Sequence, residues 1–126
     1  MNNELFNTLI AQIREKSVNT LACKNAMYST EDKLHNFRVG ADMMGGTPAQ
    51  ACWGYLTKHL VALRDKVERN DFSDLDDLME KCIDTINYTA FLWCIGYEEW
   101  AKTHDNNVVG LGLTPEEREV YCHDRK

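Results

Sequence analysis

The chain has 126 residues, a length that suits one domain with a single hydrophobic core. Hydrophobic residues make up 44% of the chain and charged residues 27%, as in folded globular proteins, so disorder of the whole chain is excluded. There are 20 acidic and 14 basic residues, which gives a net charge of −6. Bulk binding of nucleic acid or of an anionic membrane is not expected, because both need clustered lysine and arginine.

The chain shows none of the patterns of a membrane or secreted protein. No apolar run approaches the roughly 18 residues that cross a bilayer, and the amino-terminal segment lacks the basic start and long apolar centre of a signal peptide. Five cysteines are present, without the spacing of metal ligands: Cys23, Cys52, Cys82, Cys94 and Cys122. We therefore expect a cytoplasmic protein with five free thiols.

Four segments repeat apolar residues every three or four positions, which predicts amphipathic helices. They cover about residues 3–26, 34–44, 48–69 and 75–102. A polar stretch, residues 24–33, predicts a loop between the first two helices. Thr47-Pro48 predicts the start of the third helix, and Ser73 with Asp76 resembles a capping box at the start of the fourth.

The end of the chain forms a separate prediction. Residues 104–112 contain two glycines and an Asp-Asn-Asn run, which is typical of a loop, and Thr114-Pro115 predicts a short helix that ends near Cys122. No segment shows the sustained alternation of a strand. We expect an all-α bundle of about four main helices, with a helical domain over residues 1–103 and a loop and short C-terminal helix over residues 104–126.

Three polar residues fall on or beside apolar helix stripes. At about 100° per residue, His59 and Asn87 lie within the stripes of their helices, and Asp84 lies at a border. An unpaired buried amide or carboxylate costs a few kcal/mol, so these groups need partners. The partners are either side chains of a facing helix or a ligand. In the ligand hypothesis one polar pocket between the helices predicted over residues 48–69 and 75–102 holds all three residues, closed by Tyr28 and Asn36.

Two further groups are candidates for ligand binding. Glu80 and Asp84 are four residues apart and share one helix face, where they either lie in solvent or hold Mg²⁺ through carboxylate oxygens. The second group combines an aromatic ring, two basic side chains and an amide, which suits recognition of a nucleotide. Its members are Lys24, Tyr28, Asn36 and Arg38. The alternative for this second group is an ordinary loop between helices.

Three blocks of sequence resemble a known family. The first is K-N-x-x-Y followed by D-x-x-x-N-F-R, the second is A-x-W-x-x-x-x-K-H, and the third is E-x-x-x-D-x-x-N-Y. The two strings of the first block begin at Lys24 and Asp32, the second block begins at Ala51, and the third begins at Glu80. In order and spacing they resemble the phage and prophage nucleotide modification associated domain proteins. That family is grouped with the MazG-like all-α NTP pyrophosphohydrolases, and the resemblance covers about residues 21–92.

The resemblance implies a MazG-like fold and nucleotide handling in a bacterial or phage-infected cell. It also implies a Mg²⁺-dependent pyrophosphohydrolase that uses E-x-x-E on one helix and E-x-x-D on the next. This chain has no E-x-x-E in residues 48–69, and Lys81 stands where the second motif has its first Glu, which leaves Asp84 alone. The alternative is a non-catalytic phage protein that sequesters a nucleotide signal or acts through protein–protein contacts. A third possibility is a structural bundle without a ligand.

Trp93 bears on assembly. It lies well away from the main apolar stripe of the helix predicted over residues 75–102. A chain of this size cannot bury two faces of one helix internally, so we expect a homodimer or a higher even oligomer.

Overall fold

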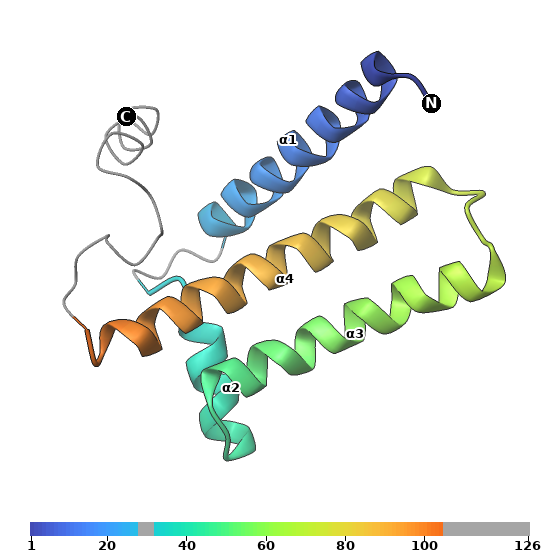
Figure 1. Ribbon diagram of the computed structural model, residues 1–126. Coiled ribbons are helices and arrows are strands. Elements are labelled where there is room, and N and C mark those ends of the chain that lie inside the picture. Colours follow the sequence, from blue (N-terminus) through green and yellow to red (C-terminus); the bar gives the residue numbers. More distant parts are fainter. Residues whose placement is uncertain (28–31, 105–126) are drawn as a thin grey trace, which may run out of the picture.

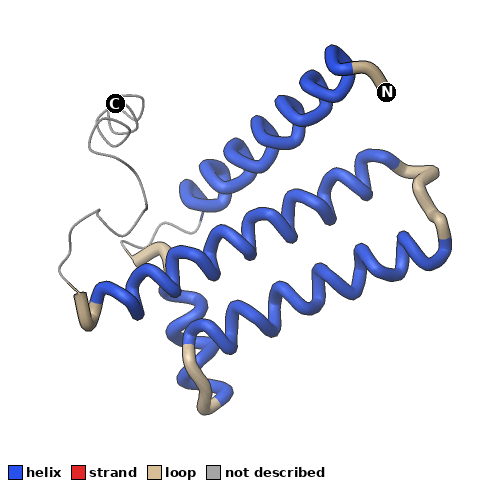
Figure 2. Tube along the Cα trace, in the orientation of Figure 1, coloured by secondary structure: helices blue, strands red, loops and turns tan. Residues whose placement is uncertain are grey.

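The computed structural model describes residues 1–27 and 32–104 and shows only helices among them (Figures 1 and 2). This confirms the all-α prediction. The helices are α1 (Asn3–Met27), α2 (His35–Met44), α3 (Pro48–Arg69) and α4 (Leu75–Ala101). Apart from His104, the predicted C-terminal unit of residues 104–126 lies outside the described residues, as does its predicted short helix. No helix in residues 1–27 and 32–104 has both the length and the apolar composition needed to cross a bilayer.

The helices are arranged around α4. Figure 1 shows α3 and α4 as a long antiparallel pair, with α2 crossing the end where α3 begins and α4 ends. In the described part of the chain α1 packs against α4 alone. Since α3 and α1 both pack on α4, the long fourth helix positions every other long element.

Local chemistry explains most helix boundaries. Thr47 caps α3 because its hydroxyl accepts a hydrogen bond from the backbone N–H of Gln50, while the Gln50 side chain accepts one from the N–H of Thr47. Gly45 ends α2 and Asn70 ends α3, both in the left-handed conformation that stops a helix.

The predicted cap of α4 and the predicted start of the first loop were wrong, whereas the first helix ends within one residue of its predicted end. The cap of α4 is Asp74, whose carboxylate accepts from the N–H of Asp77 at 3.1 Å, whereas Ser73 donates its hydroxyl to Asp71 at 2.9 Å. The helix therefore begins one residue later than the capping-box prediction implies. The first helix also continues to Met27, beyond the start of the predicted loop, because polar residues do not by themselves interrupt helical hydrogen bonding.

The hydrophobic core lies where α2, the start of α3 and the end of α4 meet. Four buried residues form it, and four partly buried ones pack around it: Leu34, Phe37, Cys52 and Ile95, with Ala49, Tyr88, Phe91 and Leu92. The Cys52 thiol is fully buried and donates to the carbonyl of Tyr88 at 3.5 Å. Burial raises the pKa of this thiol, which keeps it protonated.

The cysteines support the prediction of free thiols as far as they are described. Cys23, Cys52, Cys82 and Cys94 are all free. Cys122 lies outside the described residues.

Arg38 fastens α2 to α4. Its guanidinium donates to Asp32 at 2.6 Å and to both carboxylate oxygens of Glu98 at 2.8 Å. Two carboxylates thus share one arginine: Nε and Nη2 form a bidentate pair with Asp32, and Nη2 also reaches both oxygens of Glu98, which links α2 to α4.

A second group of ion pairs holds the far end of the α3–α4 pair. The Asp77 carboxylate lies 2.6 Å from the Lys66 ammonium on α3 and 2.6 Å from the Lys81 ammonium on α4. Lys66, and next Lys81, hold the pKa of Asp77 below its ordinary value of 3.8. Charge pairing therefore stabilises the end of the hairpin farthest from the core.

We predict that Asp77→Asn lowers the melting temperature at pH 7 and that this difference disappears in acid. A carboxyl whose pKa is lowered by folding stabilises the protein above its unfolded pKa and loses that contribution as pH falls through the folded value. The melting temperatures of parent and variant should therefore begin to converge near pH 4 and become equal only below the lowered pKa of the folded state. Asp65→Asn, at an exposed site on α3, is the matched control and should change little at either pH. A difference that persists undiminished at pH 3 would contradict the role of the Asp77 charge.

Candidate functional site

Asn87 and Ser17 join α4 to α1 through buried polar groups. Both side chains are almost fully buried. The Ser17 hydroxyl donates to the Asn87 side-chain oxygen at 2.6 Å, and the Asn87 amide donates to the Ser17 backbone carbonyl at 3.5 Å. The expected burial of Asn87 is confirmed, but its partner belongs to α1 and not to α3. This bond fixes how α1 lies along α4.

His59 and Asp84 meet across the α3–α4 interface. The distance from His59 Nδ1 to Asp84 Oδ2 is 3.8 Å, which suits an ion pair and is too long for a direct hydrogen bond. About four-fifths of each side chain is buried. The sequence placed these two residues on facing stripes, and the structure brings them together.

Aromatic rings hold His59 in place. The His59 ring lies 4.8 Å from the Tyr88 ring, which stacks on Tyr55 at 5.9 Å. Burial, and next the negative charge of Asp84, raises the pKa of Tyr88, so the phenol stays neutral. The neighbouring rings limit how far the imidazole can rotate. They therefore also fix the direction from which His59 approaches the Asp84 carboxylate.

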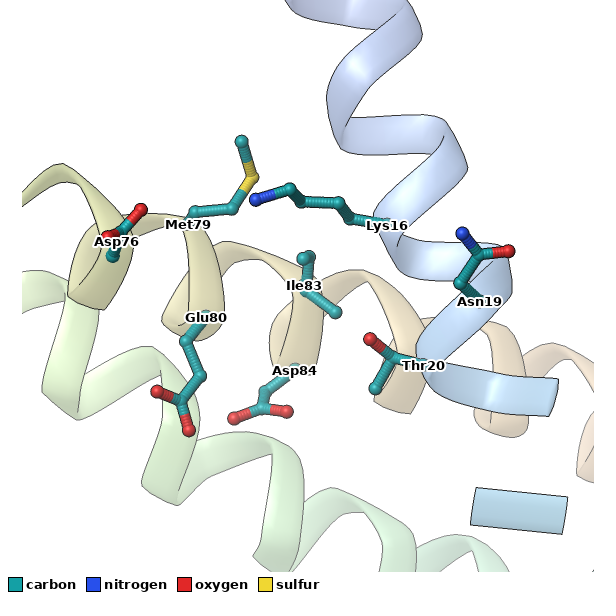
Figure 3. Close-up of a pocket in the computed structure, with 8 residues that line it drawn as sticks. All are labelled: Lys16, Asn19, Thr20, Asp76, Met79, Glu80, Ile83 and Asp84. Carbon is teal, nitrogen blue, oxygen red and sulfur yellow. The ribbon is translucent and has the colours of Figure 1, made fainter. Parts of the chain in front are cut away.

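Glu80 and Asp84 line a pocket between α4 and α1 with a volume of about 630 Å³. Figure 3 shows their carboxylates one helical turn apart and pointing to the same side, toward α3. The opposite part of the lining comes from α1, as Figure 3 also shows. It consists of Lys16, Asn19 and Thr20, and the α4 side is completed by Asp76, Met79 and Ile83.

An apolar groove continues from this pocket along the first half of α4. It has a volume of about 700 Å³ and shares Lys16, Asn19, Asp76 and Met79 with the pocket. The remaining lining is mostly aliphatic and includes Leu9, Ile10, Ile13, Leu75, Leu78 and Cys82. A polar pocket and an apolar groove therefore meet between the same two helices.

Of the four residues predicted to recognise a nucleotide from the first loop, the two whose side chains the structure describes do not line this pocket. Asn36 is exposed on α2, and Arg38 is engaged by Asp32 and Glu98. Tyr28 and the side chain of Lys24 lie outside the described residues.

Sequence reasoning missed the contribution of α1. Lys16, Asn19 and Thr20 follow one another at spacings of three and one, so they lie on one side of the helix. That polar cluster beside the apolar stripe was the available signal. Nothing in the sequence indicated that it would face Glu80 and Asp84, because helical spacing does not say which helix packs on which.

The pocket offers oxygen ligands but not a complete metal cage. In the part of the chain that the structure describes, no three His, Cys, Asp or Glu side chains lie close enough together to hold a metal ion. Two carboxylates on one face suit Mg²⁺, which keeps several water molecules and takes further oxygens from a bound phosphate. The donor set fits a Mg²⁺–phosphate complex better than a metal held by protein alone.

Comparisons with known proteins add nothing to this geometry. The chain matches no protein-family model, no curated protein and no solved structure. The family resemblance thus rests on its three sequence blocks. Of these, the second supplies His59 and the third supplies Glu80 and Asp84.

We predict that Ser17→Ala lowers the free energy of unfolding by about 1–3 kcal/mol, because the buried Asn87 oxygen loses its donor. Replacing both partners, as in Ser17→Ala with Asn87→Leu, should recover part of this loss. Thr8→Ala removes an exposed hydroxyl from the same helix and should change stability by less than about 0.5 kcal/mol. Urea denaturation measures all three. Equal effects of Ser17→Ala and Thr8→Ala would show that the buried bond does not hold α1.

Proposed function

We propose that the protein binds a nucleotide, whose phosphates are held through Mg²⁺ by Glu80 and Asp84. One observation carries this proposal. The two carboxylates point to the same side, toward α3, at the edge of a pocket whose α1 wall presents a lysine and two uncharged polar side chains. A volume of about 630 Å³ lies within the ordinary range of small-molecule sites.

The charge of the pocket explains why a cation is needed. Asp76, Glu80 and Asp84 outnumber Lys16, so a phosphate alone would be repelled. A divalent ion reverses the sign at the carboxylates and can bridge them to phosphate oxygens. Lys16 is then free to approach a second phosphate on the side of α1.

His59 is proposed to position the metal ligand Asp84. It approaches one oxygen of this carboxylate from α3, and Tyr88 restricts its ring. A partner of this kind orients a ligating carboxylate without touching the metal.

The rest of the pocket suits a base and a sugar. Asn19 and Thr20 supply donors and acceptors, while Met79 and Ile83 supply apolar surface. The resemblance to phage and prophage nucleotide-handling proteins supports a nucleotide as the ligand, and it suggests a bacterial or phage-infected cytoplasm as the setting. Hydrolysis to a monophosphate and pyrophosphate is the enzymatic form of the proposal, and sequestration of the nucleotide is the non-catalytic form.

We predict that a panel of nucleoside mono-, di- and triphosphates contains a ligand that raises the melting temperature only with Mg²⁺. A ligand at 100 times its Kd stabilises the folded chain by about 2.7 kcal/mol. Glu80→Gln and Asp84→Asn should each weaken binding at least tenfold in calorimetric titrations. Asp65→Asn keeps the same change of charge outside the pocket and should bind as the parent does.

Stability and product analysis separate the alternatives. If the pocket binds a ligand, Asp84→Asn changes the melting temperature of the free protein by only a few degrees. A large loss of stability in this variant, with no nucleotide bound by the parent, would make the His59–Asp84 pair structural. Release of pyrophosphate from a bound triphosphate would indicate an enzyme, and tight binding without turnover would indicate sequestration.

A further inference from the structure

The charged residues of α4 all lie on one side of the helix. The helix carries seven of them: Asp76, Asp77, Glu80, Lys81, Asp84, Glu98 and Glu99. At about 100° per residue they fall within an arc of about 140°. The remaining arc of about 220°, along the whole length of α4, contains no charged residue.

Part of the charged arc faces the other helices, although Asp76, Glu80 and Glu99 remain exposed. Asp77 pairs with Lys66 of α3, and Glu98 pairs with Arg38 of α2. Asp84 faces His59, while Glu80 lines the pocket beside α1. The covered face of α4 thus carries charged residues beside the buried Ile83 and Ile95, whereas the charged residues of an ordinary surface helix point into water.

The uncharged face of α4 carries a regular apolar seam. From Leu75 to Trp93 its residues follow the alternating spacing of four and three that is typical of coiled coils, and a second step of four then leads to Tyr97. The seam consists of Leu75, Met79, Cys82, Ile86, Thr89, Trp93, Tyr97 and Trp100. Within this chain the seam is only partly covered, since Leu75 is 71% exposed, Ile86 42% and Trp93 59%.

We propose that a second copy of this chain covers the seam, with the two α4 helices packed antiparallel about a two-fold axis. The axis lies between positions 82 and 86, near the middle of the seam. Cys82 of one copy then lies beside Ile86 of the other, and Leu75 at one end lies beside Trp93. Each of these pairs places a smaller side chain against a larger one, as close packing of two helices requires.

Charge favours a second copy as the occupant. Each chain carries a net charge of −6, so two copies repel at long range. On this face the repulsion is least, because every carboxylate of α4 lies on the far side of the helix. An anionic membrane is disfavoured by the same net charge, and a coiled-coil spacing suits a helical partner rather than a lipid surface.

The area of the seam is sufficient for a dimer when α1 is included. A helix of 27 residues is about 40 Å long, so two seams about 10 Å wide bury roughly 800 Å² in total. The groove beside α4 adds apolar surface from Leu9 of α1. Leu5 and Phe6 lie one turn before Leu9 on the same helix and add further apolar surface. Stable interfaces bury at least roughly 1,200 Å², so the exposed apolar surface of α1 must supply the remainder.

The inference depends on the face of α4 opposite Glu80 and Asp84, which shares only Met79 with the lining of the proposed nucleotide pocket, and it stands whether or not a nucleotide binds. It also gives a role to the exposed Trp93.

Light scattering on the full chain tests the proposal. The parent should have a mass of about 29 kDa, twice the 14.5 kDa of one chain, at tens of micromolar. Ile86→Lys places two lysines near the two-fold axis and should yield a monomer. Val61→Lys introduces the same side chain at a half-exposed site on α3 and should remain a dimer.

A second variant guards against a folding defect. Trp93→Ala keeps a good helix former on α4 and should raise the dimer Kd at least tenfold, with unchanged helix content by circular dichroism. A parent protein that is monomeric would overturn the proposal. The same holds if the monomeric parent binds neutral phosphatidylcholine vesicles, because a lipid surface would then be the occupant of the seam. It would also be overturned if Ile86→Lys folds and stays dimeric, or if Trp93→Ala dimerises as tightly as the parent.

Discussion

The division of the α4 surface into a charged arc and an uncharged arc is the constraint on which the rest of the structure depends. Carboxylates that turn toward other helices are costly unless a base, a hydrogen-bond donor or a cation meets them. The fold meets most of them with side chains from elsewhere in the chain: Lys66, His59 and Arg38. Each of these contacts also ties a different helix or helix end to α4, so pairing the charges assembles the fold.

The proposed site follows from the same arrangement. Glu80 and Asp84 are the part of the charged arc that borders a pocket, and the pocket exists because α1 is held along α4 by the bond between Ser17 and Asn87. A divalent cation would compensate the negative charge of Glu80 and Asp84 at this pocket. Binding chemistry and helix packing are thus two outcomes of one distribution of charge.

The helices were predicted well from the sequence, whereas only some of the contacts between helices were predicted. The third helix was predicted with its observed ends because Thr47-Pro48 and the break after Arg69 are local signals. The pairing of His59 with Asp84 was also within reach, since both lie on stripes of adjacent helices joined by a short turn. In these cases neighbours in sequence are neighbours in space.

Contacts between distant helices were not predictable in the same way. Asn87 was assigned to the α3 side, but it bonds to Ser17, 70 positions earlier. Arg38 was considered for a phosphate, but Glu98 binds it from 60 positions later. A helical wheel gives the direction of a side chain on its own helix and does not identify the helix that packs there. The pocket residues of α1 were missed for this reason.

Paramagnetic broadening of amide NMR signals by Mn²⁺, used in place of Mg²⁺, tests the central claim most directly. Both ions prefer oxygen ligands, and Mn²⁺ broadens the signals of nearby nuclei. The account predicts that substoichiometric Mn²⁺ first broadens amides around Glu80, Asp84 and Thr20, and does so more strongly when a bound nucleotide is present. Broadening that begins at the acidic turn around Asp71 and Asp74, or that spreads evenly over the chain, would contradict it.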